Sequence, residues 1–362
     1  MLVSRTLWLV GLVWTSSLVW AQEDVVTDEM EAAKEHVGAE KKVEEVPEGW
    51  DTSLAVGANY SYTQSQSWVG NPDGATMQFG VLMNGAANFR HGSHRWLNEG
   101  KLVHTQTRTP MIPVFVKSAD EVSIKTTYFY APKKIDWLGP FARGTLNTAL
   151  LPGYYVGADP ALVTEPSGDT FETVEAYYPL LGDDPYKLGL TGSFEPLILK
   201  EVLGVMANPV DRGTKLHVGM HLGAGAEEVF TSGGYVVKEV NDTSGEVDVG
   251  GEAFAYDKTV VIIPLESYLS VGAALEVEAA GAFNEQVNWS LSATFFQPVY
   301  TTAEAANASG SLLNTDVSAK ISVKLAKWAS IDLVAAARKF PLILDEWQFQ
   351  SGVLLTTTFN VI

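Results

Sequence analysis

The chain has 362 residues, carries a formal net charge of −19 at pH 7 and contains no cysteine. The lack of cysteine excludes disulfides, a thiolate metal site and a cysteine nucleophile. The acidic balance argues against nucleic acid as a partner, because nucleic acid requires a basic surface. The length is sufficient for two average soluble domains or for one barrel of about a dozen strands.

Residues 1–21 have the pattern of a signal peptide. Arg5 supplies the positive charge, residues 7–19 form an apolar core, and Ala21 ends the expected cleavage site. We therefore expect an exported protein whose mature chain begins at Gln22. No later stretch reaches about 18 uninterrupted apolar residues, so a membrane-spanning role would require a closed β-barrel.

Residues 22–49 differ in composition from the rest of the chain. They contain ten acidic residues, three lysines and no aromatic residue. Such a composition predicts an acidic periplasmic leader that is disordered or partly helical. A contact with a partner, or insertion into a lumen as a plug, remains open for this leader.

From Trp50 to the C-terminus, apolar residues alternate with polar or small ones. The segment 216–230 shows the pattern most clearly, because Leu216, Val218, Met220 and Leu222 alternate with His217, Gly219, His221 and Gly223. Side chains alternate between the two faces of a β-strand, so one face of each segment is apolar. A pattern repeated this often behind a secretory signal predicts an all-β fold for residues 50–362. The expected fold is a transmembrane antiparallel up-and-down β-barrel with lipid outside and a polar lumen inside.

The loops and the strand count follow from the same pattern. Long extracellular loops are expected at 107–119, 151–187, 231–245 and 301–315, and short periplasmic turns at His91–His94 and at Lys327-Trp328. A barrel with both termini in the periplasm needs an even number of strands. If 246–268 is an extracellular hairpin the barrel has twelve strands, and if 259–268 adds a strand to 246–256 it has fourteen. We favour twelve.

The closing segment WQFQSGVLLTTTF and the strands with aromatic ends resemble those of Gram-negative outer-membrane β-barrels. The spacing of SYTQSQSW, TTYFYAPKKIDW and LEVEAAGAFNEQVNWSLSATFFQPVY is similar to that in a family of secreted barrels of uncharacterised function. The resemblance covers residues 50–362. It implies location in the cell outer membrane, contact with its lipid, and insertion by the barrel-insertion machinery. Such barrels usually end in an aromatic residue, whereas this chain ends in Val361-Ile362, which puts the insertion signal in question.

Charged residues on the inward positions are the candidate functional residues. They could line a path that selects ions or small solutes, or they could pair across strands and fill the barrel. The first alternative predicts porin-like passive passage, and the second a structural or surface-interaction barrel that acts through its loops. The sequence leaves the solute and the oligomeric state open. The candidate lumen-lining residues are Arg143, Lys215, His217, His221, Glu227, Glu276, Glu278, Lys320, Lys324, Asp332 and Arg338.

Neither a metal site, a cofactor nor a catalytic site is expected. Residues four apart on a strand are about 13 Å apart, so His217 and His221 cannot share one ion. The run His91-Gly92-Ser93-His94 suggests a lipid hydrolase as a distant third function, but it lacks the sequence of the outer-membrane phospholipases and lies in a predicted turn. Aromatic residues are expected at the membrane interfaces. These are Tyr60, Tyr62, Tyr128, Tyr130, Trp289 and Trp347.

Overall fold

The computed structural model describes residues 48–360 except 66–73, 111, 113–114, 133, 136, 158, 168–169, 177–185, 212–214, 250–251, 304–310, 327 and 343. The predicted signal peptide and nearly all of the predicted leader lie outside the described residues. Within the described part of the chain, no helix is long and apolar enough to cross a membrane.

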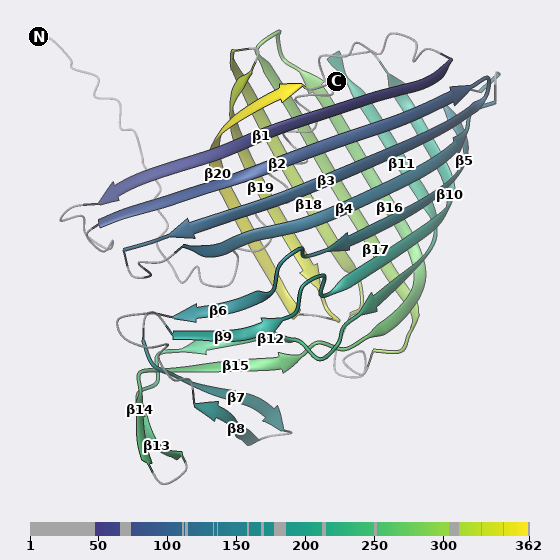
Figure 1. Ribbon diagram of the computed structural model, residues 1–362. Coiled ribbons are helices and arrows are strands. Elements are labelled where there is room, and N and C mark those ends of the chain that lie inside the picture. The colour runs from purple at the N-terminus through teal and green to yellow at the C-terminus, as the bar shows by residue number, and fades with distance from the viewer. Residues whose placement is uncertain are drawn as a thin grey trace, which may run out of the picture.

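In the described residues, twelve antiparallel strands form a closed barrel (Figure 1). The ring closes where the first and last strands pair, from Ala55 opposite Asn360 to Asn59 opposite Thr356. The strands are β1 (Gly49–Ser65), β2 (Gly74–His91), β3 (His94–Arg108), β4 (Val116–Tyr130), β5 (Leu138–Thr148), β10 (Leu197–Asp211), β11 (His217–Phe230), β16 (Tyr268–Ala282), β17 (Val287–Thr301), β18 (Asn314–Ala326), β19 (Ala329–Phe340) and β20 (Leu344–Asn360).

The twelve-strand prediction is confirmed. Residues 246–267 lie outside the wall of the barrel, and the next wall strand, β16, begins at Tyr268. The wall strand β10 begins at Leu197, a few residues after the strand Tyr186–Thr191 of the preceding connection. Pro196 ends the preceding connection and supplies no N–H for strand pairing, which fits a strand that begins after it.

Two long connections, between β5 and β10 and between β11 and β16, carry further strands. The sheets are β6 (Gly153–Gly157) with β9 (Tyr186–Thr191), β13 (Gly245–Val249) with β14 (Glu252–Tyr256), and the four-stranded sheet β12 (Tyr235–Asn241), β15 (Lys258–Pro264), β7 (Ala161–Ser167) and β8 (Thr170–Ala176). The parallel pairing of β15 with β7 joins the two connections. The long loop expected at 151–187 therefore lies outside the barrel wall and contains strands of its own.

The extra sheets pack around their own apolar cluster. Buried Val163, Val237, Val260 and Ile262 contact one another there, together with Tyr155. Figure 1 shows these sheets at the lower end of the barrel, called the sheet end below, whereas β1 begins and β20 ends at the opposite, terminal end.

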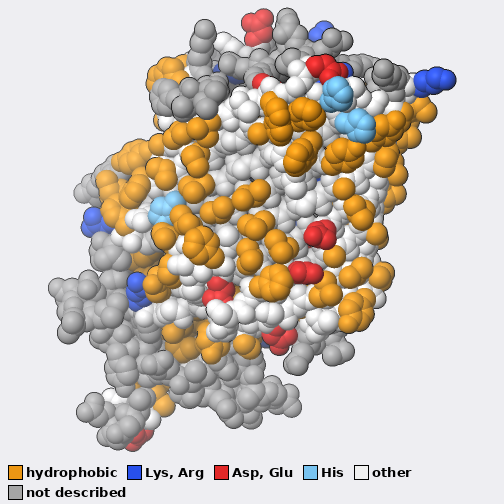
Figure 2. Space-filling view, turned by 45° about the vertical axis from the view of Figure 1, so that its right-hand side comes forward, with side chains coloured by type: hydrophobic (Ala, Val, Ile, Leu, Met, Phe, Trp, Pro, Cys, Tyr) orange, Lys and Arg blue, Asp and Glu red, His pale blue; other side chains and the backbone are white. Residues whose placement is uncertain are grey.

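The two faces of the wall alternate as the sequence predicted. On β11, Leu222 is 61% exposed on the outside, while its neighbour His221 is 5% exposed on the inside. Figure 2 shows hydrophobic side chains spread over the outer face of the wall. A continuous apolar surface of this extent is not expected for a protein surrounded by water, because soluble monomers expose only small apolar patches.

Exposed aromatic residues flank this apolar band at both ends. Trp50 and Tyr60 stand ten residues apart on β1 and are both exposed. At about 3.3 Å per residue and a tilt of about 45°, their separation along the barrel axis is about 23 Å, which matches the apolar height of about 25 Å in outer-membrane barrels. The terminal-end girdle comprises Trp50, Trp96, Tyr128, Tyr130, Trp137, Phe283 and Trp328, and the sheet-end girdle Tyr60, Phe79, Phe115, Phe230, Tyr300 and Trp347.

Four of the predicted interface residues, Tyr60, Tyr128, Tyr130 and Trp347, are confirmed as exposed. Trp289 is half-buried against Phe283. The side chain of Tyr62 lies outside the described residues.

The interior is less uniformly polar than the sequence predicted. Buried Leu82 and Val103 contact each other on β2 and β3, and Phe129, Phe141 and Met206 form a second apolar cluster on β4, β5 and β10. These five side chains occupy the inward positions of their strands. These strands therefore present apolar side chains to the lumen beside charged ones such as Lys101 and Arg143.

Candidate functional site

Ten of the eleven predicted lumen-lining residues lie on strands, at inward positions. They are Arg143 on β5, His217, His221 and Glu227 on β11, Glu276 and Glu278 on β16, Lys320 and Lys324 on β18, and Asp332 and Arg338 on β19. The assignment of Lys215 was wrong. β11 begins at His217, so Lys215 lies in the preceding turn, where it is exposed.

Arg143 organises a polar cluster that spans four strands. Its guanidinium forms an ion pair with Glu276, and it donates hydrogen bonds to Nε2 of His221 at 3.2 Å and to Oγ1 of Thr127 at 3.1 Å. Because a guanidinium can only donate, Nε2 of His221 is the acceptor and the imidazole is neutral in this arrangement. The cluster ties β4 and β5 to β11 and β16 across the intervening β10.

Paired glycines leave room for this crossing. Gly204 on β10 stands opposite Gly223 on β11, so neither strand places a side chain on the lumen face at that level. A Cβ added at Gly204 would overlap the carbonyl oxygen of Leu222. The alternation of glycine and alanine in residues 223–226 therefore serves the close packing of the wall as well as the path of Arg143.

Glu278 lies on the same inward face of β16 as Glu276, opposite Gly219 of β11. Its carboxylate is 4.0 Å from Nε2 of His217, and its side chain is 43% exposed. A Cβ at Gly219 would lie 2.6 Å from Oε1 of Glu278, so the carboxylate rests against this glycine. Two predicted histidines thus each approach a different carboxylate.

Glu227, Lys320 and Asp332 form pairs between neighbouring strands. Glu227 accepts from Lys200 at 2.8 Å and from the hydroxyl of Tyr268 at 3.0 Å. Lys320 lies 3.7 Å from Asp332. Asp332 also accepts from the hydroxyl of Ser322.

Several lumen charges were missed from the sequence. Lys101 pairs with Glu121 at 3.4 Å, and Asp316 pairs with Arg338 at 3.0 Å. Segment 95–106 alternates poorly, because its inward positions include Leu97 and Val103 as well as charged residues, which hides the inward position of Lys101. On β10 the inward positions mix charge with apolar residues, so the pattern did not separate Lys200 from the outward Glu201.

Among the side chains on the lumen face that the structure describes, the charges are nearly balanced, with eight acidic and nine basic groups. The acidic ones are Asp51, Glu99, Glu121, Glu227, Glu276, Glu278, Asp316 and Asp332, and the basic ones are Arg90, Arg95, Lys101, Lys125, Arg143, Lys200, Lys320, Lys324 and Arg338. In the part of the chain that the structure describes, no group of three or more His, Cys, Asp or Glu could hold a metal ion.

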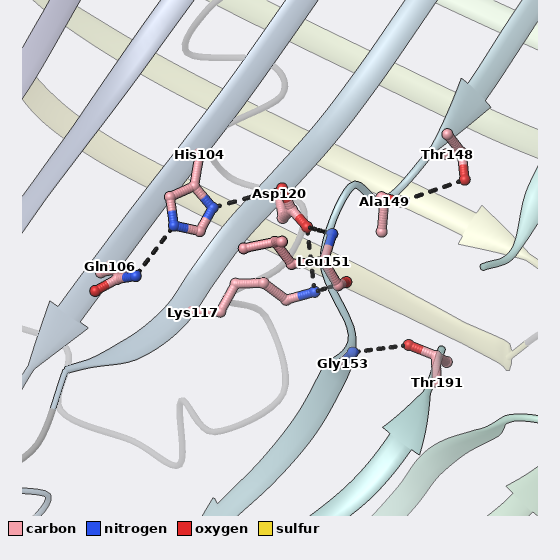
Figure 3. Close-up of polar contacts among 9 residues, drawn as sticks. All are labelled: His104, Gln106, Lys117, Asp120, Thr148, Ala149, Leu151, Gly153 and Thr191. Carbon is pink, nitrogen blue, oxygen red and sulfur yellow. Dashed lines mark hydrogen bonds and ion pairs between the residues drawn. The ribbon is translucent and has the colours of Figure 1, made fainter. Parts of the chain in front are cut away.

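A second polar cluster lies on the outer face at the sheet end (Figure 3). Asp120 accepts from the N–H of Leu151 and lies 3.5 Å from both His104 and Lys117, while Lys117 donates to the carbonyl of Leu151 at 2.8 Å. His104 also contacts the amide of Gln106 at 3.1 Å. The contacts drawn in Figure 3 hold the start of the connection between β5 and β10 against the barrel wall. The sequence placed Lys117 in a loop, whereas β4 begins at Val116.

The His91–His94 segment forms the predicted turn at the terminal end. Glu48 accepts from the N–H of Gly92 at 3.0 Å and lies 3.3 Å from His91. The Gly92 hydrogen bond, together with His91, holds the pKa of Glu48 below its usual range. His94 contacts the hydroxyl of Tyr128 at 2.5 Å.

The two long connections are also held together at the mouth of the barrel. The carboxylate of Glu195 accepts from the N–H of Ser232, from the hydroxyl of Ser232 at 3.1 Å and from the N–H of Gly192 at 2.8 Å. These donors, the Ser232 N–H foremost, hold the pKa of Glu195 below its usual range.

A closed antiparallel wall, an exposed apolar band between two aromatic girdles and a charged interior define a transmembrane β-barrel. No family model matches the chain, and no curated protein matches it. The resemblance to secreted barrels of uncharacterised function therefore stays a prediction.

Three solved structures that are similar to this chain are distant from it in sequence. The translocator domain of the autotransporter NalP from Neisseria meningitidis is 7% identical, with 95% of this chain and 99% of that chain covered and a TM-score of 0.37. The NanC porin is 6% identical, with 84% and 98% covered and a TM-score of 0.36. The toluene transporter TodX of Pseudomonas putida is 8% identical, with 87% and 90% covered and a TM-score of 0.30. The barrel architecture of this chain is established by its own strand pairing and not by these similarities.

Proposed function

We propose that this protein is an outer-membrane channel for the passive passage of small hydrophilic solutes or ions. The observation that carries the proposal is the solvent exposure of charged side chains inside the barrel. The side chain of Lys200, near the sheet end, is 40% exposed, that of Glu276 is 21% exposed, and that of Glu278, toward the terminal end, is 43% exposed. Water therefore reaches charged groups at several levels of the lumen.

The arrangement of the lumen charges also suits passage. Pairs such as Lys101 with Glu121 keep their side chains along the wall, since both partners lie on adjacent strands. Charges fixed on the wall of a pore act on passing ions without having to move.

The sheet end is proposed to face the outside of the cell. Outer-membrane barrels have long extracellular connections and short periplasmic turns, and the predicted signal peptide supports export. In this orientation the terminal end faces the periplasm, and the apolar band contacts membrane lipid after insertion by the barrel-insertion machinery.

Passage through the lumen can be tested by placing the same bulky residue on either face of one strand. Ala274 of β16 faces the lumen opposite Gly223, whereas its neighbour Ala273 faces outward. We expect discrete conductance steps from the refolded protein in planar bilayers, a smaller unitary conductance for Ala274→Trp and an unchanged one for Ala273→Trp.

Folding of each variant is checked by its heat-modifiable migration on gels. A folded wild-type protein that never conducts contradicts the proposal. Equal conductance of the wild type and a folded Ala274→Trp variant would mean that the current does not pass through the lumen, which also contradicts the proposal.

A second candidate function is surface interaction through the extra sheets. It is favoured by the buried cluster around Val260 and Ile262, which gives the two connections a folded core of their own. A silent, correctly folded barrel would make this second candidate the leading one.

A further inference from the structure

The side chains that the structure describes in the lumen are acidic and basic in nearly equal numbers, although the whole chain carries a net charge of −19. The net charge of the chain therefore does not determine which ions the lumen favours. Selectivity must depend instead on which lumen charges are compensated by a nearby partner and which of them water reaches.

Most acidic groups in the lumen have a lysine or arginine partner. Each pair joins two strands of the wall. The pairs are Glu276 with Arg143, Glu227 with Lys200, Glu121 with Lys101, Asp316 with Arg338 and Asp332 with Lys320. Asp51 and Glu99 have partners as well. An ion pair with its partner in contact projects only a weak field toward a passing ion, because the two charges nearly cancel at a distance.

Glu278 differs from these acids in its ion-pair partner and in its exposure to water. Within the described residues its ion-pair contact is with an imidazole, that of His217 at 4.0 Å, and not with a lysine or arginine. An imidazole carries a positive charge only when it is protonated, and at neutral to basic pH it is mostly neutral. The same carboxylate is 43% exposed, which is more than that of its neighbour Glu276 at 21%.

The position of Glu278 is fixed by the wall around it. The carboxylate lies against Gly219, where no side chain covers it from the β11 side. The charged groups that act on it electrostatically are Glu276, Lys125, His217 and Arg143, and within the described residues only His217 reaches ion-pair distance. Glu278 is therefore a carboxylate on the lumen wall whose negative charge faces water.

We propose that Glu278 is the residue that gives the channel a preference for cations. This inference rests on the proposed channel function. A single carboxylate about 6 Å from the path of an ion in a water-filled lumen raises the local cation concentration about threefold and lowers the local anion concentration about threefold. Screening by salt reduces this effect, so the measurement requires low ionic strength.

The test is the reversal potential of the refolded protein in planar bilayers under a potassium chloride gradient at pH 8. We expect a potassium-to-chloride permeability ratio above 1 for the wild type and a ratio at least about threefold lower for Glu278→Gln. Glu278→Asp keeps the charge and is expected to keep the preference. Glu239→Gln, at an exposed position of β12 outside the barrel, makes the same change in net charge and is expected to leave the ratio unchanged.

The possible results separate this inference from the channel proposal. A wild-type ratio at or below 1, or a Glu278→Gln variant that conducts with the wild-type ratio, overturns the role of Glu278 while the channel stands. An equal fall in Glu239→Gln assigns the preference to charge outside the lumen and also overturns it. A folded wild type without conductance overturns both proposals.

Discussion

Glu195 is expected to hold the two long connections together at the mouth of the barrel. Its carboxylate is buried, with the residue 7% exposed, and it receives hydrogen bonds from Gly192 in its own connection and from Ser232 in the other. Substitution of Glu195 by alanine leaves two backbone N–H groups without their acceptor. Each such loss costs about 1–3 kcal/mol in a buried setting.

The expected effect is therefore a loss of about 3 kcal/mol in the free energy of local opening at this junction. Because every 1.4 kcal/mol corresponds to a factor of ten, the amides of Gly192 and Ser232 should exchange with solvent about a hundredfold faster. Hydrogen exchange measured by mass spectrometry on peptides covering 190–196 and 230–235 reports this change. Glu195→Gln retains an acceptor oxygen and should show a smaller increase.

The same junction should depend on pH in a direction fixed by the lowered pKa of Glu195. A carboxyl group whose pKa is lower in the folded state stabilises it fully above the unfolded pKa of about 4.3, and the stabilisation is lost as the pH falls through the folded value. Protection of the Ser232 amide against hydrogen exchange should therefore be constant from pH 7 to pH 5. It should decline below the unfolded pKa of about 4.3, and only in the wild type. Wild-type protection in Glu195→Ala, or an unchanged pH profile in Glu195→Gln, would refute the reasoning.

Three further predictions concern the barrel wall. Arg143→Met should lower the free energy of unfolding by about 3 kcal/mol, because it leaves Glu276 without its partner, and Arg143→Met combined with Glu276→Gln should recover most of the loss in urea titrations of the folded barrel. Gly204→Ala should cost about 1–3 kcal/mol, because the added methyl group meets backbone, whereas Gly144→Ala, with 3.5 Å to a Thr126 methyl group, should be nearly neutral; equal costs would contradict the packing argument. Lipids brominated near the headgroup should quench the tryptophans of the terminal-end girdle more strongly than lipids brominated near the chain ends, and the reverse order would place that girdle away from the interface.

The alternation of side chains was sufficient to predict the faces of most strands. In a strand, neighbouring residues point to opposite sides whatever the strand pairs with. For that reason His221 and Glu276 could be placed in the lumen from the sequence, and Leu222 on the outer face. The turn at His91–His94 followed from the end of one alternating segment and the start of the next.

Strand number and loop structure required the tertiary structure. Residues 259–263 are an apolar run that suits a strand of the barrel wall as well as a strand of another sheet. The structure places them beside β7, from a connection about a hundred residues earlier in the chain. Periodicity is a local property, whereas the choice of a partner strand depends on which apolar surface is available elsewhere in the fold.

The partners of the lumen charges were also decided only by the fold. The sequence placed Arg143 and Glu276 on inward faces, but they are separated by 133 positions and by two intervening strands. The pairing of β5, β10, β11 and β16 and the small residues Gly204 and Gly223 between them bring them together. The sequence by itself determined which side of each strand meets lipid or lumen, because that depends on neighbouring residues alone. Which charges compensate one another depends on distances across the closed barrel, which only the tertiary structure fixes.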